Sequence, residues 1–440
     1  MRIAMIGGGY VGLVSGACFA DLGVEVGIVE SDPARLAALA EGRMPIYEPG
    51  LDRLVADNVA AGRLGFTGDL RAAVAGVDAV FIAVGTPTRR GDGHADLSFV
   101  HAAAEQVARA LTSYAVVVTK STVPVGTGRR IAAILRRTRP DLPVDVASNP
   151  EFLREGSAIG DFMRPDRVMI GTDSERARDV LRRLYRPLYL IEAPILFTSL
   201  EAAELTKYAA NSFLAMKVTF INEMADLCEK VGADVHDVAR GIGLDGRIGR
   251  KFLHPGPGFG GSCFPKDTLA LMRTAQDWGA PSRLVEATVA VNDARKSGMA
   301  ARIMAACGGS VHGKTVAVLG LTFKPETDDM RDAPSIPIIS RLAQDGAVIR
   351  AFDPVGMDGA RALLPEGVTY CADAYDAVAG ADVLVVVTEW NEFRALSPER
   401  LRGAMRGRLV MDLRNVFDPA AFVAAGLHYH GIGRTAKPGP

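Results

Sequence analysis

The chain opens with Met1-Arg2-Ile3-Ala4-Met5-Ile6-Gly7-Gly8-Gly9-Tyr10-Val11-Gly12, and this stretch decides the fold predicted for the first part of the protein. Its first six residues are mostly apolar, which is typical of a short buried strand, and residues 13–22 have the pattern of a helix. Gly7, Gly9 and Gly12 between them have the G-x-G-x-x-G spacing. The first glycine permits a tight turn, the second lets the backbone approach a pyrophosphate, and the third allows close helix–strand packing. The stretch therefore predicts a dinucleotide-binding unit.

The residue after the second predicted strand indicates which dinucleotide. Residues 24–29 form this strand, and Glu30 follows it. A carboxylate at this position can accept hydrogen bonds from both ribose hydroxyls and would repel a 2′-phosphate. The sequence therefore predicts NAD rather than NADP. The alternative is a glycine-rich turn in an α/β protein that binds no dinucleotide.

The composition agrees with a soluble enzyme. The 440 residues predict two or three domains, and the net charge of −1 favours neither a nucleic acid nor a membrane surface as partner. The five cysteines are widely spaced and include no C-x-x-C pair, which indicates a reducing compartment and no metal site. The chain has no signal-peptide pattern and no apolar run near the roughly 18 residues of a membrane span. We expect a cytoplasmic protein.

Polar residues follow three further predicted strands, at residues 77–84, 115–119 and 144–147. Thr86, Thr122 and Glu151 come just after these strands. Ligands of open α/β sheets bind at the carboxyl ends of the strands, so all three are candidate site residues. From position alone, the two threonines could equally serve ordinary turns.

Residues 199–231 contain neither Gly nor Pro and are rich in helix formers, so they predict one long helix. It is apolar nearly all round, and we expect it to be buried on several faces, joining two domains or forming a subunit contact. Lys207 and Asn211 are four residues apart and therefore share one face. Polar groups on such a helix need partners, and a salt-bridged lysine with a capped asparagine is the alternative to a catalytic pair.

A second strand–helix alternation begins at Lys314, with strands expected at residues 315–321, 348–352, 383–388 and 409–413. Its first turn, Gly320-Leu321-Thr322-Phe323-Lys324, lacks the three-glycine spacing. The predicted fold class is α/β: two Rossmann-like, doubly wound parallel-sheet domains joined by a long central helix and a helical middle region. We place the domains at residues 1–198, 199–300 and 301–440.

The stretch Gly260-Gly261-Ser262-Cys263-Phe264-Pro265-Lys266-Asp267 carries the most informative thiol. Cys263 lies between a glycine turn and a helix start, where backbone dipoles stabilise a thiolate and raise its nucleophilicity. A buried cysteine beside a turn is the alternative. A reactive thiol together with an NAD site implies oxidation through a covalent intermediate.

Seven ordered motifs, spread over essentially the whole chain, resemble those of the UDP-glucose/GDP-mannose dehydrogenase family. They are residues 7–12, 84–87, 121–127, 149–156, 204–211, 259–267, and Phe323-Lys324 with Arg331. Residues 154–159, 164–167 and 246–249 are similar to the UDP-glucose branch of this family. One departure is Glu30, where many relatives carry Asp, so the ribose geometry could differ slightly.

The resemblance implies an N-terminal NAD-binding domain, a helical middle that builds a homodimer, and a C-terminal domain that holds UDP. It also implies two sets of contacts. The NAD contacts would be Val11, Glu30, Arg35, Thr86, Thr122, Glu155, Lys266 and Arg331, beside Gly7, Gly9 and Gly12. The contacts to the substrate, UDP-glucose, would be Phe152, Leu153, Arg154, Glu155, Lys207, Asn211, Arg247, Phe252, Leu253, His254, Pro255, Gly256, Gly260, Lys324 and Arg414. In such enzymes the residue at Arg247 can reach the partner subunit's site.

Oxidation of a sugar CH2OH to a carboxylate removes four electrons, as two hydrides. Lys207 and Asn211 would stabilise the oxyanion of the first step, and Cys263 would add to the aldehyde before the second. Asp267 and Glu151 are both candidates for the base; family analogy favours Glu151 for thioester hydrolysis, with Thr122 placing the water. Alternatives to UDP-glucose oxidation to UDP-glucuronate are oxidation of GDP-mannose or a UDP-N-acetylhexosamine, and an NAD-responsive binding protein without turnover.

Overall fold

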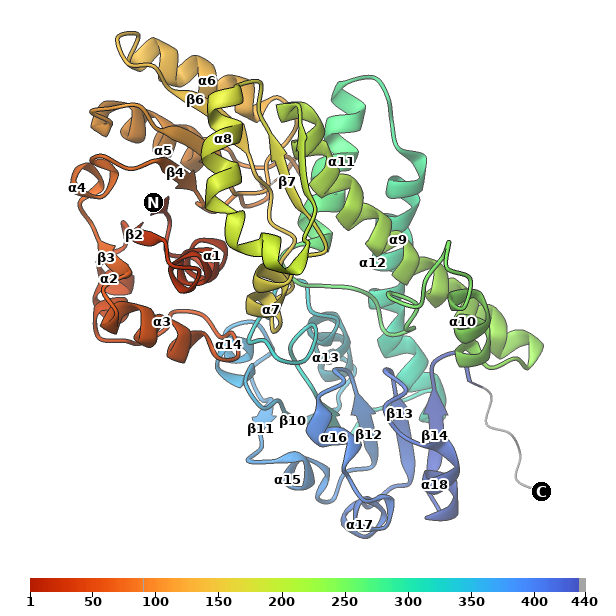
Figure 1. Ribbon diagram of the computed structural model, residues 1–440. Helices are drawn as coiled ribbons and strands as arrows, with labels where there is room; N and C mark the ends of the chain where they lie inside the picture. The colour runs from red at the N-terminus through yellow and green to blue at the C-terminus, as the bar shows by residue number, and fades with distance from the viewer. Residues whose placement is uncertain (90, 435–440) are drawn as a thin grey trace. The chain divides into compact units, whose positions relative to one another are not determined.

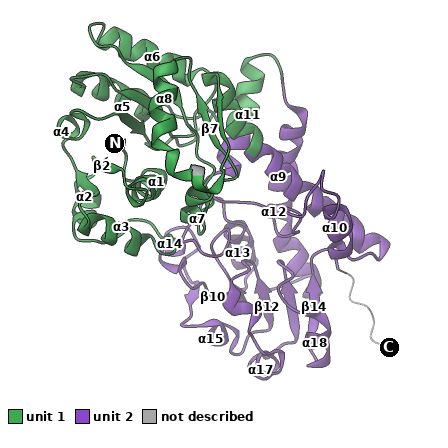
Figure 2. Ribbon diagram, in the orientation of Figure 1, with its two compact units in different colours: residues 1–210, 269–280 green, residues 211–268, 281–440 purple. Residues whose placement is uncertain are grey.

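The structure is a computed structural model that describes residues 1–89 and 91–434. The chain forms two compact units, coloured separately in Figure 2. Unit 1 comprises residues 1–210 and 269–280, and unit 2 comprises residues 211–268 and 281–440. Helices α9 (Leu200–Val231) and α11 (Phe264–Asp277) each contribute residues to both units. The three-domain boundaries expected from the sequence remain predictions.

Unit 1 is built on an eight-stranded sheet with the order β3-β2-β1-β4-β5-β6-β7-β8 (Figure 1). The strands are β1 Arg2–Ile6, β2 Glu25–Val29, β3 Leu64–Thr67, β4 Ala79–Ile82, β5 Val116–Thr119, β6 Asp145–Ser148, β7 Val168–Gly171 and β8 Ile195–Thr198. The first six run parallel, in the order of a dinucleotide-binding sheet. β7 pairs antiparallel with β6, and β8 runs parallel to β7. The predicted α/β class with a doubly wound sheet is confirmed.

Both faces of this sheet are covered by helices, because successive strand residues alternate between two cores. Ile3 and Met5 belong to one buried cluster, and Ala4 and Ile6 to the other. The first face is covered by α1, α3, α7 and α8, and the second by α4, α5 and α6. The helices of this unit are α1 Tyr10–Asp21, α2 Pro33–Ala40, α3 Leu51–Ala60, α4 Leu70–Val74, α5 Ser98–Ala110, α6 Thr127–Thr138, α7 Ala158–Met163, α8 Glu175–Leu184 and the 3-10 helix η1 Arg186–Ile191.

Unit 2 contains a six-stranded, wholly parallel sheet with the order β11-β10-β9-β12-β13-β14. Counted from its own first strand, this is the same order as in unit 1. The strands are β9 Thr315–Leu319, β10 Val348–Phe352, β11 Thr369–Tyr370, β12 Val383–Val386, β13 Leu409–Asp412 and β14 His428–Gly431. The helices are α10 Val235–Gly243, α12 Arg283–Ala306, α13 Ser335–Gln344, α14 Met357–Arg361, α15 Ala374–Val378, α16 Asn391–Arg394, α17 Pro398–Ala404 and α18 Pro419–Ala424. The second predicted Rossmann-like domain is thus present.

The first turn of the unit 2 sheet is closed by the protein's own carboxylate. Asp353, which is fully buried at the end of β10, accepts hydrogen bonds from the N–H groups of Leu321 (2.7 Å) and Thr322 (3.1 Å). It also accepts from Gly356 N (2.7 Å) and Trp390 Nε1 (3.1 Å). In a glycine-rich dinucleotide turn, N–H groups at this position face a phosphate. In unit 2, Asp353 binds the N–H groups that would otherwise face a phosphate. The first turn of this Rossmann-like sheet therefore does not need the three-glycine spacing.

Much of α9 is buried, as expected, but one stripe is exposed in the single chain, and the expected subunit contact of this helix stays a prediction. The side chains of Phe213, Phe220 and Leu227 recur every seven residues and are 59%, 45% and 51% exposed in the single chain. The opposite face is buried through residues such as Ile221 and Ala225. Apolar side chains repeated on one exposed helix face are typical of an interaction surface.

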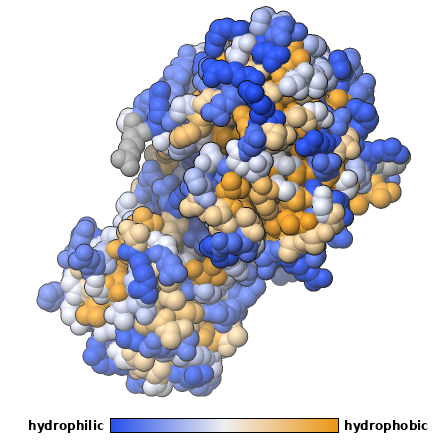
Figure 3. Space-filling view, turned by 90° about the vertical axis from the view of Figure 1, so that its left-hand side faces the viewer, coloured by the Kyte–Doolittle hydropathy of each residue, from blue (hydrophilic) through white to orange (hydrophobic). Residues whose placement is uncertain are grey.

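Hydrophilic residues are spread over the whole of the face drawn in Figure 3, with hydrophobic residues in patches among them. Within residues 1–89 and 91–434, no helix has the length and apolar character needed to cross a membrane.

Candidate active site

The glycine loop between β1 and α1 has the geometry that its spacing predicts. Gly7 has φ +108°, and a Cβ on it would lie 2.8 Å from the Ala83 carbonyl oxygen. A Cβ on Gly12 would lie only 1.9 Å from the Gly7 oxygen, so this position must be glycine for the helix to pack on the turn. A Cβ on Gly9, in contrast, would meet nothing within 4 Å. The loop is therefore tight on its protein side and open at Gly9, as a pyrophosphate site requires.

Glu30 lies at the end of β2 and faces this loop. Its carboxylate is buried and accepts hydrogen bonds from Gly8 N (3.1 Å) and Asp32 N (2.9 Å). Arg35 Nη1 lies 3.8 Å from Glu30 Oε2, so the structure brings these two predicted cofactor residues together. A fixed carboxylate next to the glycine loop fits the ribose diol of NAD.

Thr86 and Thr122 follow β4 and β5 and are joined to each other. The Thr86 hydroxyl donates to the Thr122 carbonyl at 3.0 Å, and Ser121 Oγ donates to Val84 O at 2.6 Å. The ends of the two strands are thus held side by side at the carboxyl edge of the sheet. These bonds are compatible with a role in turns as well as with a role in cofactor or water placement.

The segment after Thr122 is fastened to α9 by Glu204. This carboxylate is 2% exposed and accepts hydrogen bonds from Gly126 N (2.7 Å) and Gly128 N (2.6 Å), at the start of α6. Burial raises the pKa of Glu204 to about 7, although the two backbone N–H groups act in the opposite direction. The Glu204 carboxyl therefore titrates near neutral pH, and it is bonded to the segment that follows Thr122.

Lys207 and Glu151 form a buried ion pair. Lys207 Nζ donates to Glu151 Oε1 at 3.0 Å, and Leu153 N donates to Oε2 at 2.5 Å. Burial alone would raise the pKa of Glu151, but the Lys207 ammonium and the Leu153 N–H outweigh it, so this pKa lies below its ordinary value. The ring of Phe152 lies 5.4 Å from Lys207 Nζ. The structure therefore joins an anionic carboxylate and a lysine, both proposed as catalytic, in one arrangement.

Two residues that sequence reasoning missed support these groups. Lys120 is buried at the end of β5 and donates to Asn149 Oδ1 (3.1 Å) and Tyr185 Oη (3.3 Å), and burial lowers its pKa to about 8. Asn149 lies two residues before Glu151, so Lys120 holds the segment that carries this carboxylate. A lysine directly after the predicted buried strand at residues 115–119 was the available signal.

Glu48 is the second missed residue. It is buried, accepts hydrogen bonds from Gly156 N (2.6 Å) and Ala158 N (2.7 Å), and accepts another from the Tyr10 hydroxyl. It therefore ties the start of α1, beside the glycine loop, to the segment that contains Phe152, Leu153, Arg154 and Glu155. Arg154 itself is exposed and paired with Asp161.

In unit 2, Cys263 directly precedes the first residue of α11, Phe264. The carbonyl of Cys263 accepts the first helical hydrogen bond, from Asp267 N at 2.8 Å, and its Sγ lies 3.5 Å from Ser262 Oγ. The thiol is partly exposed. The predicted position at a helix N-terminus, where backbone N–H groups favour a thiolate, is present.

Asp267, one turn into α11, connects two other predicted site residues, Asn211 and Lys266. It is 1% exposed, and it accepts from Asn211 Nδ2 at 2.6 Å and from Lys266 Nζ at 2.7 Å. The carboxylate orients the Asn211 amide and leaves the amide oxygen and the second N–H for other contacts.

Residues 252–261 form a closely packed segment in front of Cys263. Phe252 has a left-handed φ of 65°. A Cβ on Gly256 would lie 2.9 Å from Arg414 Nη1, and one on Gly260 would lie 2.4 Å from Asp332 O. Gly261 N donates to Arg331 O at 2.8 Å. Gly256 thus lies against Arg414. Gly260 and Gly261 lie against the main chain of Asp332 and Arg331.

The remaining predicted substrate residues of unit 2 differ in their placement. Lys324 Nζ lies 5.3 Å from the Phe323 ring, and Arg414 Nη2 donates to Phe323 O at 3.1 Å. Leu253 and Pro255 are buried, whereas His254 is exposed. The side chain of Arg247 is 90% exposed and paired with Asp245, so its expected reach to a partner subunit's site stays a prediction.

Comparison with protein families gives three matches along the chain. Residues 1–189 match the NAD binding domain of the UDP-glucose/GDP-mannose dehydrogenase family, residues 201–294 match its central domain, and residues 317–419 match its UDP binding domain.

Individual relatives are similar over nearly the whole chain. A UDP-glucose 6-dehydrogenase of Rhizobium meliloti (strain 1021) is 61% identical over 436 residues, which cover 99% of this chain and 100% of that protein. The solved structure of a UDP-glucose dehydrogenase from Pyrobaculum islandicum has a TM-score of 0.88 and 39% identity, covering 96% of this chain and 98% of that one. A UDP-D-ManNAc dehydrogenase from Pyrococcus horikoshii has a TM-score of 0.85 and 27% identity, with 99% of both chains covered.

Proposed function

Because this chain belongs to the UDP-glucose/GDP-mannose dehydrogenase family, an NAD-dependent oxidoreductase family, we propose that it oxidises UDP-glucose to UDP-glucuronate through a thioester on Cys263. The choice of UDP-glucose is supported by the full-length relative of that name at 61% identity. The observation that carries the mechanism is the partly exposed Cys263 thiol at the start of α11, beside the bonded set of Asn211, Lys266 and Asp267.

Unit 1 fits the cofactor. The turn that is open at Gly9 would hold the pyrophosphate, and Glu30 would accept hydrogen bonds from the ribose hydroxyls. Thr86, Thr122, Val11, Glu155 and Arg35 of unit 1, with Lys266 and Arg331 of unit 2, are proposed as further contacts. When bound, NAD accepts one hydride in each of two successive oxidations.

In the first oxidation, the sugar CH2OH gives its proton to a base, for which Asp267 and Glu151 are the candidates, loses a hydride and becomes an aldehyde. Lys207 is proposed to donate to the developing C6 oxyanion, because its ammonium is held in place by Glu151 at 3.0 Å. Asn211, fixed by Asp267, supplies a neutral donor from the next turn of α9. Removing one preorganised donor of this type costs about 2.7–4 kcal/mol of transition-state stabilisation. The roles of Phe152 and of the segment Phe252 to Gly256 are to hold the sugar and UDP.

In the second oxidation, Cys263 Sγ adds to the aldehyde carbon and forms a thiohemiacetal, which carries an oxyanion and a transferable hydride on one carbon. Loss of that hydride leaves a thioester. Water then attacks the thioester, releasing the acid and restoring the thiol. Glu151 is proposed to take the proton of this water, because its lowered pKa keeps it ionised at neutral pH. Thr122 is proposed to help place the water, and Asp267 stays the alternative base.

A substrate panel tests the proposal. Reduction of NAD is followed with UDP-glucose, GDP-mannose, a UDP-N-acetylhexosamine and no sugar. We expect the highest kcat/KM with UDP-glucose, and two NADH per sugar consumed. A plateau at one NADH would contradict the double oxidation. NAD binding without oxidation of any panel member would instead favour the binding protein without turnover.

The variant Cys263→Ser tests the role of the thiol, since serine is a far poorer nucleophile at neutral pH. We expect acid formation to be nearly abolished and NAD binding to be retained. Cys307→Ser is a matched control, because Cys307 is also partly exposed but lies at the end of α12. Acid formation by Cys263→Ser at a rate comparable to the wild type would exclude the thioester route.

We also propose a homodimer through the exposed stripe of α9 formed by Phe213, Phe220 and Leu227. Large aromatic and aliphatic side chains repeated on one helix face are typical of a helix–helix interface. A monomer at micromolar concentration in analytical ultracentrifugation would contradict it.

A further inference from the structure

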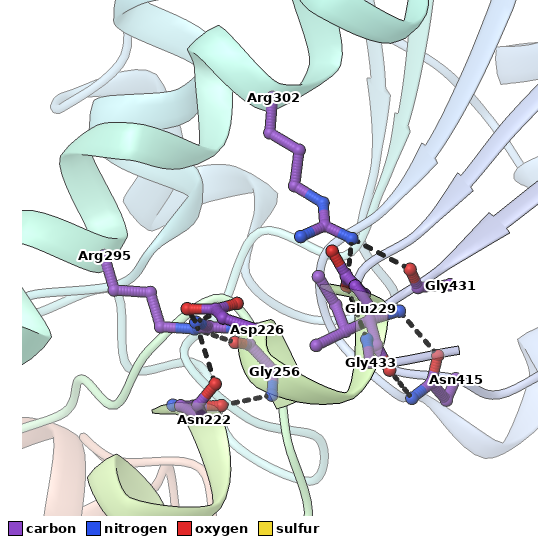
Figure 4. A network of polar contacts seen from close by, with 10 residues as sticks. Asn222, Asp226, Glu229, Gly256, Arg295, Arg302, Asn415, Gly431 and Gly433 are labelled. Atoms are coloured by element: carbon purple, nitrogen blue, oxygen red, sulfur yellow. Dashed lines mark hydrogen bonds and ion pairs between the residues drawn. The ribbon is translucent and has the colours of Figure 1, made fainter. Parts of the chain in front are cut away.

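The main chain in front of Cys263 is held by side chains of α9 and α12 that no part of the proposed chemistry uses (Figure 4). Asn222 of α9 accepts a hydrogen bond from Gly256 N at 2.8 Å. Arg295 of α12 donates from Nε to Gly256 O at 2.7 Å and from Nη1 to Asn222 O at 3.2 Å. Both backbone groups of Gly256 are therefore paired with side chains, and the Arg295 side chain also binds the main-chain carbonyl of Asn222.

Asn292 repeats this arrangement three residues further along the segment. Its Oδ1 accepts from Phe259 N at 2.8 Å, and its Nδ2 donates to Phe259 O at 3.1 Å. Asn292 and Arg295 are one turn apart on α12, so a single helix face holds both positions. Asn222, Asn292 and Arg295 are 2%, 3% and 8% exposed.

We propose that Asn222, Asn292 and Arg295 are positioning residues. They fix the segment of residues 252–261 and, through it, the thiol of Cys263. The inference rests on the proposed function, because it assigns these bonds to the placement of nucleotide sugar and Cys263. Gly256 is packed against Arg414, and Cys263 follows Phe259 by only four residues. A shift of the segment would therefore move the sugar contacts and the sulfur together.

The segment of residues 252–261 is closely packed and has little room for another conformation. A Cβ on Gly258 would lie 2.8 Å from Lys296 Cγ and 3.0 Å from Asn292 Oδ1. Buried main-chain N–H and C=O groups must be paired, and at Gly256 and Phe259 only these three side chains are close enough to pair them in the part of the chain that the structure describes. These polar side chains thus provide the hydrogen bonds that neighbouring backbone groups would provide in a helix or a strand.

The same network contains a control that does not touch the segment. Arg302, two turns further along α12, donates from Nη2 to Glu229 Oε1 and, at 3.0 Å, to Gly431 O. Glu229 accepts in turn from Gly433 N at 2.6 Å. Arg302 therefore ties residues 431–433 to α9, and Figure 4 shows that Arg302 and Arg295 have separate partners.

The test compares Asn292→Asp, Arg295→Lys and the control Arg302→Lys in the full-length protein. Asn292→Asp keeps the size and the acceptor for Phe259 N, but it places an oxygen opposite Phe259 O. Arg295→Lys keeps the charge beside Asp226, but an ammonium cannot reproduce the planar set of bonds to Gly256 and Asn222. Each variant is checked by thermal melting, and kcat and both KM values are measured.

We expect both segment variants to lower kcat/KM for UDP-glucose about 10- to 100-fold, by a higher KM for the sugar and a lower kcat, because misplacement of about 1 Å costs this much. The KM for NAD should stay unchanged, and Arg302→Lys should behave like the wild type. A lower kcat with unchanged KM values would indicate only a loss of folded protein and would overturn the inference. So would wild-type kinetics in both segment variants.

A readout without turnover separates this inference from the proposed function. The rate at which iodoacetamide alkylates Cys263 is followed by peptide mass in all four proteins. We expect it to change in Asn292→Asp and Arg295→Lys and not in Arg302→Lys, even if the wild type oxidises no sugar of the panel. An identical rate in all four proteins would exclude the placement of the thiol by these residues.

Discussion

Glu204 makes the stability of unit 1 depend on pH, and Glu204→Gln removes that dependence. The carboxyl has an ordinary pKa of 4.5, and burial raises it to about 7 in the folded protein. Between these values the folded state binds more protons than the unfolded state. Stability is therefore highest below pH 4.5 and is lost as the pH rises through about 7.

The size of the effect follows from the shift. Each pKa unit corresponds to about 1.36 kcal/mol, so the full difference is about 3 kcal/mol, of which about 2.5 kcal/mol is lost between pH 5 and pH 8. The side chain is 2% exposed, so screening by solvent removes little of this. Glu204→Gln adds a constant cost of about 1–3 kcal/mol, because its amide cannot accept from both N–H groups, but this cost does not vary with pH.

The assay is urea unfolding at pH 5 and pH 8, followed by far-ultraviolet circular dichroism, in the wild type and in Glu204→Gln. Glu201→Gln is a matched control from one turn earlier on α9, where Arg129 lowers the pKa of the carboxyl and the pH dependence has the opposite sign. The expected result is a loss of wild-type stability at pH 8, relative to the variant. Equal pH dependence in the wild type and Glu204→Gln would show that the Gly126 and Gly128 N–H groups outweigh burial, and would refute the reasoning.

Three other substitutions have defined outcomes. Gly12→Ala would place a Cβ 1.9 Å from a carbonyl oxygen and should abolish NAD binding measured by calorimetry, whereas Gly9→Ala meets no protein atom within 4 Å and should leave the fold intact. Lys207→Met leaves Glu151 without its 3.0 Å partner and should lower kcat about 10²- to 10³-fold, with the KM for NAD retained; an unchanged kcat would remove Lys207 from the chemistry. Phe220→Asp puts a charge on the exposed stripe of α9 and should shift a dimer toward monomer in ultracentrifugation.

The sequence was sufficient for the α/β class, because the glycine spacing and the apolar strands are local signals. The reversal of β7 relative to β6 was not predicted, since it depends on where the chain returns to the sheet. Exposure of Phe213 and Phe220 was also missed, because apolar character alone does not tell a core from an uncovered face. The bounds of the nine predicted strands agree with the structure within two residues, but β3, β7, β8, β11 and β14 were not predicted.

The site could be predicted only where residues lie within one motif. Cys263 and Asp267 are close because one helical turn separates them. The pairing of Lys207 with Glu151, and the contacts of Glu48 to residues more than one hundred positions away, depend on the folded sheet. Asn292 gave no signal, since it is one polar residue on a mixed helix.

The carboxylate of Asp353 sets a limit on how the proposed reaction can run. A phosphate approaching the first turn of the unit 2 sheet would meet a negative charge that already takes up the N–H groups there. The first turn of unit 2 is therefore no second dinucleotide site, and the glycine loop of unit 1 would serve both hydride transfers of the proposed four-electron oxidation. On this proposal, spent cofactor would leave and fresh cofactor would bind between the two oxidations, while the half-oxidised sugar stays bound.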